Sequence, residues 1–336
     1  SIAYHLALRG ADGVVLADVG EIAGGAPGKA MGGVRQQFAT EAEVRLVQGS
    51  VPLFRELGAP LFEQVGYLFL ATTAAGLADL ERRRAIQASL GVPVETVDAG
   101  FVDGLRVDDV LGATICREDG IADPTGVTRD LVRRAAARGV EVREGTDALS
   151  LDAETLVIAC GARSAEVARA RGVELPVRPL VRQLADVGPV PGLPLDLPMT
   201  VEEDSFHFRR VGADGLQIAM GEAEPRWDGP EDVRDDLVAA WRERLAARYP
   251  RAAGAPVRRA WAGFYDMTPD AHPIIGRVAD GVYAACGFSG HGFMQSPAVG
   301  AAVAAELLGD TAPYDLSPYR LDRFEAGAIF PETLVL

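Results

Sequence analysis

The sequence predicts a mixed α/β fold in which a domain built on a parallel sheet is interrupted by a domain built on an antiparallel sheet. Short apolar strands alternate with helices in the first half of the chain and again near its end, which is typical of a parallel sheet. Residues 177–222 contain longer strand candidates separated by tight turns. The length of 336 residues fits two domains at roughly 150 residues each, interleaved rather than consecutive.

The chain opens with the second half of a dinucleotide-binding unit. Residues 1–9 have the apolar spacing of a helix that stops at Gly10, and residues 14–18 (VVLAD) form a short buried strand that closes on Asp18. In βαβ units that bind dinucleotides, an acid at this place accepts the ribose hydroxyls. We therefore expect Asp18 to bind a ribose, and the alternative is a cap on a turn.

The first half of that unit, a strand followed by GxGxxG, does not precede the first helix. The strand would lie in the middle of the parallel sheet, and its glycine loop would bind a pyrophosphate at the helix N-terminus. We therefore expect the native chain to be longer than these 336 residues. An intact native mass of 35.5 kDa would contradict this expectation.

The remaining elements follow in order along the chain. Residues 23–38 contain six glycine and proline positions, which predicts a loop whose backbone approaches another group closely. Up to Gly161 the pattern predicts helices at 41–57, 77–91 and 123–139 and strands at 66–72 and 156–164. Beyond it we expect strands within 177–222, an amphipathic helix at 231–249, a strand at 281–286 and a glycine-rich turn that becomes a helix at 287–309.

Composition and charge exclude several classes of protein. Lys and Arg number 33 and Asp and Glu 48, so the net charge of −15 argues against a nucleic-acid binder or a partner with an anionic membrane surface. No apolar run approaches the roughly 18–20 residues of a membrane span. The three cysteines form no CxxC and the four histidines are scattered, so we expect no metal site and a reducing, cytoplasmic location.

Three segments carry a family resemblance. Residues 261–300, with WAGFYDMTPDAHPIIG and GVYAACGFSGHGFMQSPAVG, resemble the C-terminal flavin segment of the D-amino-acid oxidase, sarcosine oxidase and glycine oxidase superfamily. AGGAPGKAMGGVRQQF (23–38) is similar to that family's flavin-proximal loop, and TLVIACGARS (155–164) to its internal strand–glycine motif. The resemblance implies a Rossmann-like FAD-binding domain at 1–60, 113–170 and 262–336 and a substrate-binding domain at 61–112 and 171–261.

The resemblance also implies the chemistry. In this family a hydride leaves the carbon next to a substrate amine and reaches the flavin, which carries the reaction while the protein binds and orients. We expect the substrate to be a small amino acid or an N-methyl amino acid and the electron acceptor to be O2 or another carrier. A flavin subunit of a multi-subunit amino-acid dehydrogenase and a catalytically inactive FAD-fold remnant are the alternatives. The protein is expected as a homo-oligomer or as a subunit of a heteromeric complex.

The glycine pattern and the resemblance together assign a set of FAD-binding residues. These are Asp18, Ala26, Gly28, Lys29, Gly32, Gly33, Cys160, Gly161, Ala162, Gly263, Gly287, Ser289, Gly290, His291, Gly292, Phe293 and Met294. The turn at 287–292 feeds a helix whose N-terminus would face the part of the flavin that becomes negative on reduction. The alternatives are a surface turn for His291, packing for Phe293, a small core residue for Cys160 and a solvated loop for Lys29.

The residues expected to act on the substrate are Arg35, Tyr265 and His291. Arg35 ends the flavin-proximal loop and is the first candidate to bind a substrate carboxylate, and Arg182 on a predicted strand is the second. For both arginines the alternative is a structural or solvated ion pair. We expect Tyr265 to close the pocket over the amine, and its alternative is core packing.

Three departures from the family pattern limit the expected chemistry. Gly263 stands where monomeric sarcosine oxidases carry the cysteine that attaches the flavin, so FAD is expected to bind non-covalently. Gln217 replaces a lysine that assists the reaction with oxygen, and Met294 replaces a lysine that often binds the substrate carboxylate. Oxidase and dehydrogenase activity therefore both stay open. The turn at 268–270 (TPD) and His272 are expected beneath the flavin ring, and a plain proline turn is the alternative.

Overall fold

One large sheet dominates the computed structural model, which describes residues 1–331. Its strand order is β14-β10-β13-β12-β11-β4-β6-β5, and β15 pairs with β10. In sheet order the bounds are Arg226–Trp227 (β14), Arg178–Val187 (β10), Gly215–Ala219 (β13), His207–Val211 (β12), Met199–Glu202 (β11), Tyr67–Ala71 (β4), Gly112–Cys116 (β6) and Val94–Val97 (β5), with Val257–Met267 for β15. The sheet is mixed rather than purely antiparallel, because β4 and β11 pair in parallel. These two strands are joined by a long connection, so no hairpin turn sets their relative direction.

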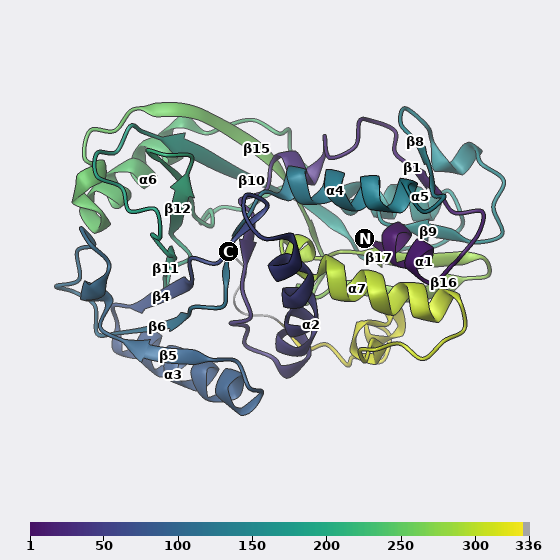
Figure 1. Cartoon of the computed structure of the whole chain (residues 1–336), viewed down its shortest axis with the longest axis horizontal. Helices are drawn as coiled ribbons and strands as arrows, with labels where there is room; N and C mark the ends of the chain where they lie inside the picture. The colour runs from purple at the N-terminus through teal and green to yellow at the C-terminus, as the bar shows by residue number, and fades with distance from the viewer. Residues whose placement is uncertain (332–336) are drawn as a thin grey trace.

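Two helices cover opposite faces of the large sheet (Figure 1). Helix α6 (Asp235–Arg248) packs Trp241 and Leu245 against the face that carries Phe206 and Phe208. Helix α3 (Ala74–Ser89) packs Leu80 against the other face, beside Tyr67, Phe69 and Val201. Because side chains alternate along a strand, a residue between two core phenylalanines points away from α6.

The parallel strands form two small separate sheets instead of the single parallel sheet that the sequence predicts. Strand β1 (Val15–Ala17) pairs in parallel with β8 (Glu141–Arg143). Strand β9 (Leu156–Ile158) pairs in parallel with β17 (Val282–Cys286), which pairs antiparallel with β16 (Ile274–Ala279). Within residues 1–331 no strand pairs with the second edge of β1 or β9. This single-edge pairing also explains why Val15, expected in a buried strand, is 40% exposed.

Three long helices and two short ones surround the small sheets within residues 1–331. Helix α1 (Ile2–Leu8) packs between α4 (Pro124–Ala136) and α7 (Gly292–Leu307), and α2 (Glu41–Leu57) packs against α7 at a steep angle (Figure 1). Helix α5 (Ser164–Arg169) follows β9. The helix expected at 41–57 has those bounds, because Thr40 accepts a hydrogen bond from the Glu43 amide at its start and Gly58 ends it. The helices expected at 77–91 and 231–249 begin instead at Ala74 and Asp235.

A third small sheet ties the loop at 23–38 to the rest of the fold. Strand β7 (Gly120–Ala122) lies between β2 (Gly33–Val34) and β3 (Phe62–Glu63). The 3-10 helices are Ala26–Gly28, Ala99–Phe101, Ala148–Ser150, Gly161–Arg163, Pro250–Ala252, Ser317–Tyr319 and Leu321–Arg323. The domain boundaries expected at 113 and 262 fall inside β6 and β15, so both strands continue the large sheet across them.

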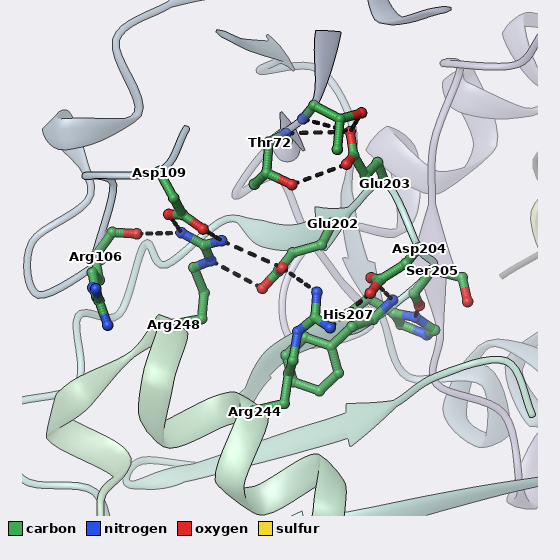
Figure 2. Close-up of polar contacts among 12 residues, drawn as sticks. Thr72, Arg106, Asp109, Glu202, Glu203, Asp204, Ser205, His207, Arg244 and Arg248 are labelled. Atoms are coloured by element: carbon green, nitrogen blue, oxygen red, sulfur yellow. Dashed lines mark hydrogen bonds and ion pairs between the residues drawn. The ribbon is translucent and has the colours of Figure 1, made fainter. Parts of the chain in front are cut away.

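An ion-pair network fixes α6 to the end of β11 (Figure 2). The buried carboxylate of Glu202 accepts from Arg248 Nε at 2.9 Å and from an Arg244 Nη at 2.6 Å. Arg248 also donates to Asp109 at 2.7 Å. The neighbouring Glu203 turns the other way and binds the backbone amides and hydroxyls at the start of α3, which include the Thr72 hydroxyl at 2.9 Å. Both covering helices are therefore held by one strand end.

Candidate active site

The loop at 23–38 lies directly on the face of the large sheet opposite α6. The Trp261 indole Nε1 on β15 donates to the Lys29 carbonyl at 3.0 Å. The Lys29 stem packs against Gly263, where a Cβ would lie 3.0 Å from the Lys29 Cδ. A Cβ on Gly33 would lie 2.7 Å from the Tyr67 hydroxyl, so only glycine allows this approach of loop to sheet. The close backbone approach expected from the glycines is therefore to the sheet.

Arg35 is fully buried at the end of this loop, although arginine is rarely buried. Its Nη1 donates to the Gln37 carbonyl at 2.7 Å, and its Nη2 lies 3.4 Å from His291 Nε2. The guanidinium lies over the Phe38 ring at 3.9 Å. Burial therefore excludes a solvated position for this arginine.

Arg182 is the second arginine of the site, and it projects from β10. Its Nε and Nη1 are buried and have no hydrogen-bond partner in the described part of the chain. Its guanidinium lies 5.6 Å from the centroid of the Tyr265 ring, on the neighbouring strand β15. Buried guanidinium nitrogens without acceptors are costly, so this arrangement favours a bound anion.

Two tyrosines and a histidine lie near these charges. Burial raises the pKa of both Tyr67 and Tyr265 above the ordinary tyrosine value, so both stay protonated donors. His207 is 5% exposed, and burial, with Arg35 and Arg182 nearby, lowers its pKa to about 4. His207 Nδ1 lies 2.6 Å from the Ser205 carbonyl and therefore donates to it. The imidazole is neutral at physiological pH with a fixed tautomer.

The glycine-rich turn before α7 faces Tyr265. A Cβ on Gly290, whose φ is +89°, would lie 2.4 Å from the Tyr265 ring, so only glycine fits there. The Gly287 amide donates to the Asp266 carboxylate at 2.7 Å, and the Ser289 amide donates to the Asp266 carbonyl at 3.1 Å. Burial raises the pKa of Asp266. Because no side chain within residues 1–331 caps α7, its first amides can donate to an acceptor in front of the helix.

The turn at 268–272 is held by side-chain hydrogen bonds and an ion pair, so it is not a plain proline turn. The Asp270 carboxylate binds Arg323 Nε at 2.8 Å, and Thr268 donates to the His272 carbonyl at 2.7 Å. His272 is fully buried, with Nδ1 2.8 Å from Glu43 of α2 and Nε2 2.6 Å from the Phe330 carbonyl. This turn holds together α2, β15 and the C-terminal segment beside the glycine-rich turn.

The predicted adenosine end lies at the carboxyl ends of β1 and β9. One Asp18 oxygen accepts from the Gly20 amide at 2.8 Å, which is the turn cap named as the alternative, and the residue is exposed. Gly161 has a φ of +53° and nothing within 4 Å of its Cβ position, and Ala162 follows in the same 3-10 helix. Cys160 is exposed because β9 already ends at Ile158, so its interpretation as a core residue is wrong.

Several other assigned residues are placed as follows. His291 is 3% exposed and meets the Phe38 ring edge-on at 5.0 Å, so the surface-turn alternative is wrong. Phe293 packs on Phe54 at 5.4 Å, which is the packing alternative. Lys29 forms an ion pair with Glu231 at 2.5 Å. The rest of the set lies in the loop (Ala26, Gly28, Gly32) or in the first turn of α7 (Gly292 and Met294), where the Met294 side chain is buried in the core.

Sequence reasoning missed three buried groups beside the site: Tyr67, Asp119 and His207. A signal for His207 exists in SFHFRR, since alternation puts it on the face opposite Phe206 and Phe208. Asp119 has no such signal, because its contacts are to Gln36 and Gln37, 83 and 82 residues earlier in the chain.

No cluster of His, Cys, Asp or Glu suited to a metal ion occurs within residues 1–331. No helix in this part of the chain is long and apolar enough to cross a membrane. The candidate site thus has two sides. Arg35, Arg182, Tyr67 and Tyr265 form a buried cationic and aromatic wall on one side, and the glycine-rich turn with the start of α7 lies on the other.

Strand β17, the glycine-rich turn and α7 follow one another beside the large mixed sheet, and the cationic and aromatic wall lies between this unit and the sheet. This combination is typical of a flavin-dependent oxidoreductase fold. Residues 1–306 match the family described as FAD dependent oxidoreductase, DAO, and the chain belongs to this family. The flavoprotein resemblance and the fold expected from the sequence are thereby confirmed, apart from the separation of the parallel strands.

Relatives and solved structures agree with this assignment. FAD-dependent oxidoreductase domain-containing protein 1 of Xenopus laevis is 26% identical over 366 residues, which cover 87% of this chain and 72% of that protein. Sarcosine oxidase subunit beta of Arthrobacter sp. is 26% identical over 373 residues, covering 98% and 89%. The structure of L-proline dehydrogenase from P. horikoshii matches with a TM-score of 0.89 at 27% identity, covering 97% of this chain and 94% of that one. Glycine oxidase from Geobacillus kaustophilus, at 23% identity with a TM-score of 0.85 and coverage of 96% and 95%, shows the shared fold.

The residues present fit FAD at its ring end. The first amides of α7, which no side chain within residues 1–331 caps, suit the ring edge that becomes negative on reduction. The open space around Gly161 lies at the end of β9, on the predicted adenosine side. Among these residues, Gly290 and Gly292 would hold the ring through their backbone.

Proposed function

We propose that this protein oxidises the C–N bond of a small amino acid or N-methyl amino acid. The observation that carries the proposal is Arg182, whose Nε and Nη1 are buried without hydrogen-bond partners within the described chain. A guanidinium fork suits a carboxylate, which an amino acid brings and a simple amine does not. The names of similar proteins, sarcosine oxidase subunit beta and L-proline dehydrogenase, support the same class of substrate.

The residues have separate tasks in this proposal. Arg182 binds the substrate carboxylate, and Arg35, which like Arg182 lies near His207 and Tyr265, adds a second positive charge. Tyr265 shields the reacting carbon from water, since it lies between Arg182 and the turn at Gly290. FAD, when bound, supplies the group that accepts the hydride. Fixed charges and amides arranged in advance stabilise the charge that develops during the transfer.

The binding mode and the electron acceptor are part of the proposal. Gly263 provides no thiol, so we assign non-covalent FAD. Gln217 hydrogen-bonds Asp186 at 3.0 Å and accepts from Arg209 at 3.2 Å, so the position expected for a cationic oxygen-activating group holds a neutral amide. This favours a dehydrogenase that passes electrons to a carrier. Sarcosine oxidase subunit beta is by name one subunit of a larger enzyme, which supports a heteromeric assembly as the second candidate.

Anaerobic bleaching of the flavin absorbance against a panel of amino acids and N-methyl amino acids tests this function. We expect bleaching by at least one amino acid and none by the corresponding decarboxylated amine. Arg182→Ala should raise the KM for that amino acid about 10- to 100-fold, the equivalent of one charge-assisted hydrogen-bonded pair, with little change in the rate at saturation.

Arg178→Ala is the matched control, because Arg178 lies on the same strand but is exposed and paired with Asp228 at 2.5 Å. Its KM should equal that of the wild type. A panel in which amines bleach the flavin as readily as amino acids would contradict the carboxylate role. An equal KM for Arg182→Ala and Arg178→Ala would contradict it as well.

A further inference from the structure

A buried carboxylate beside the site has no role in the function proposed so far. Asp119, in the turn between β6 and β7, is 0% exposed. Its Oδ1 accepts from the Gln36 amide nitrogen at 3.0 Å and from Gln36 Nε2 at 3.1 Å, and its Oδ2 accepts from Gln37 Nε2 at 3.1 Å. No arginine, lysine or histidine forms an ion pair with it in residues 1–331. A buried carboxylate without a cation is costly, so its contacts need an explanation.

The two glutamines that Asp119 holds directly follow Arg35 in the chain. The Gln37 carbonyl accepts from Arg35 Nη1 at 2.7 Å, and Gln37 Nε2 also donates to the Tyr67 carbonyl at 2.8 Å. Asp119 therefore fixes the Gln36 backbone amide and the side chains of Gln36 and Gln37, while Arg35 binds the Gln37 carbonyl. Residues 35–37 are thereby held by hydrogen bonds between the β6–β7 turn and strand β4.

We propose that Asp119 is a positioning residue that holds Arg35 in the orientation in which it adds its positive charge to that of Arg182 at the substrate carboxylate. The inference rests on the proposed function and deepens it, because it adds a residue that acts through Arg35 without touching the substrate. A carboxylate accepts hydrogen bonds on both oxygens, and bonds to an ionised acceptor are roughly twice as strong as neutral ones. This explains why an acid, rather than an amide, stands at this buried position.

Asp119→Asn tests the proposal with almost no change of volume. An asparagine keeps one acceptor oxygen, but its NH2 would face the NH2 group of a glutamine, and two donors cannot form a hydrogen bond. The hydrogen bonds to either Gln36 or Gln37 are therefore lost. We expect the KM for the amino acid that bleaches wild-type flavin to rise about tenfold, with the saturated rate of flavin reduction unchanged. A structural defect would instead lower the amount of folded, flavin-loaded protein and leave the KM of the remainder unaltered.

Four further proteins complete the experiment: two single variants, Arg35→Ala, and Arg35→Ala combined with Asp119→Asn. Glu118→Gln removes the neighbouring carboxylate, which is half-exposed and paired with Arg55, and its KM should match the wild type. Gln37→Met removes the amide held by Asp119 and should reproduce the rise in KM, which keeps the proposal testable where Asp119→Asn fails to fold. In an Arg35→Ala background, Asp119→Asn should add nothing to the KM, since the residue acts only through Arg35. Additive effects, or an unchanged KM in both single variants, would overturn the proposal.

Binding of acetate, followed by calorimetry on the purified protein, separates this inference from the proposed function. We expect Asp119→Asn to weaken acetate binding by the same factor of about ten. If no amino acid bleaches the wild type but acetate binding depends on Asp119, the proposed function fails and the positioning role stands. If amino acids bleach the wild type and neither acetate affinity nor KM depends on Asp119, the positioning role is overturned and the function stands.

Discussion

The buried His207 makes a prediction about how stability depends on pH. Its pKa in the folded protein is about 4, against an ordinary value of 6.5, because burial and the charges of Arg35 and Arg182 disfavour the imidazolium. His207→Asn removes the titrating group, and the asparagine NH2 can still donate to the Ser205 carbonyl. The variant should therefore lose pH dependence rather than the hydrogen bond.

The sign and size follow from the two pKa values. Between pH 4 and 6.5 the unfolded chain binds a proton at His207 that the folded protein does not, so stability rises with pH through this window. From pH 5 to pH 8 this residue alone should add about 2 kcal/mol to the free energy of unfolding. Asp119 works in the opposite direction, since burial raises its pKa to about 6 and favours its protonated form. The contribution of Asp119 to the free energy of unfolding is present at low pH and is lost as the pH rises from 3.8 through about 6.

Urea unfolding followed by tryptophan fluorescence at several pH values from 5 to 8 measures the effect. The difference in free energy of unfolding between wild type and His207→Asn should change by about 2 kcal/mol across this range, with the variant gaining relative stability at pH 5. Val201→Ala is the control, because Val201 is fully buried, lies opposite His207 in the sheet and does not titrate. Its cost should be the same at every pH. A pH slope for His207→Asn identical to that of wild type would refute the reasoning.

Other expected outcomes concern stability and cofactor binding. Arg248→Met should lower the free energy of unfolding by about 3–5 kcal/mol, because it leaves Glu202 buried without its main cation. Arg244→Met should lower it by only about 1 kcal/mol or less, because Arg244 is half-exposed. Equal losses for the two variants in urea unfolding would contradict this difference. Acid precipitation should release all flavin into the supernatant, and flavin retained by the pellet would disprove non-covalent binding. Gly290→Ala should reduce the flavin content of the purified protein, measured by absorbance, because its Cβ would overlap the Tyr265 ring.

Local signals predicted the parts of the fold that depend on neighbouring residues. The helix at 41–57 has a threonine cap and a terminal glycine, and both are readable from the sequence. The glycine spacing at 287–292 likewise identified the turn that faces Tyr265, because only glycine satisfies that contact. The helix at 74–89 starts earlier than expected, since Thr73 caps it at a position where the apolar pattern is weak.

Contacts between distant segments were beyond reach for a physical reason. Whether Arg35 or Arg182 has a bound counter-charge depends on which strands become neighbours, and strand pairing across large separations has no local signature. The mixed direction of the large sheet escaped for the same reason, as β4 and β11 pair in parallel although a long stretch of chain lies between them. The hold of Asp119 on Gln36 and Gln37 is a third case.

Strand β15 sets a mechanical constraint on how this protein can move. Over residues 257–267 it is hydrogen-bonded along β10, and its Asp266 binds the turn that begins α7. A hinge between the sheet and that turn would have to break these bonds together, so Arg182, Tyr265 and the start of α7 belong to one rigid body. In the proposed oxidation, rotation of the large sheet against the start of α7 should therefore contribute little to turnover.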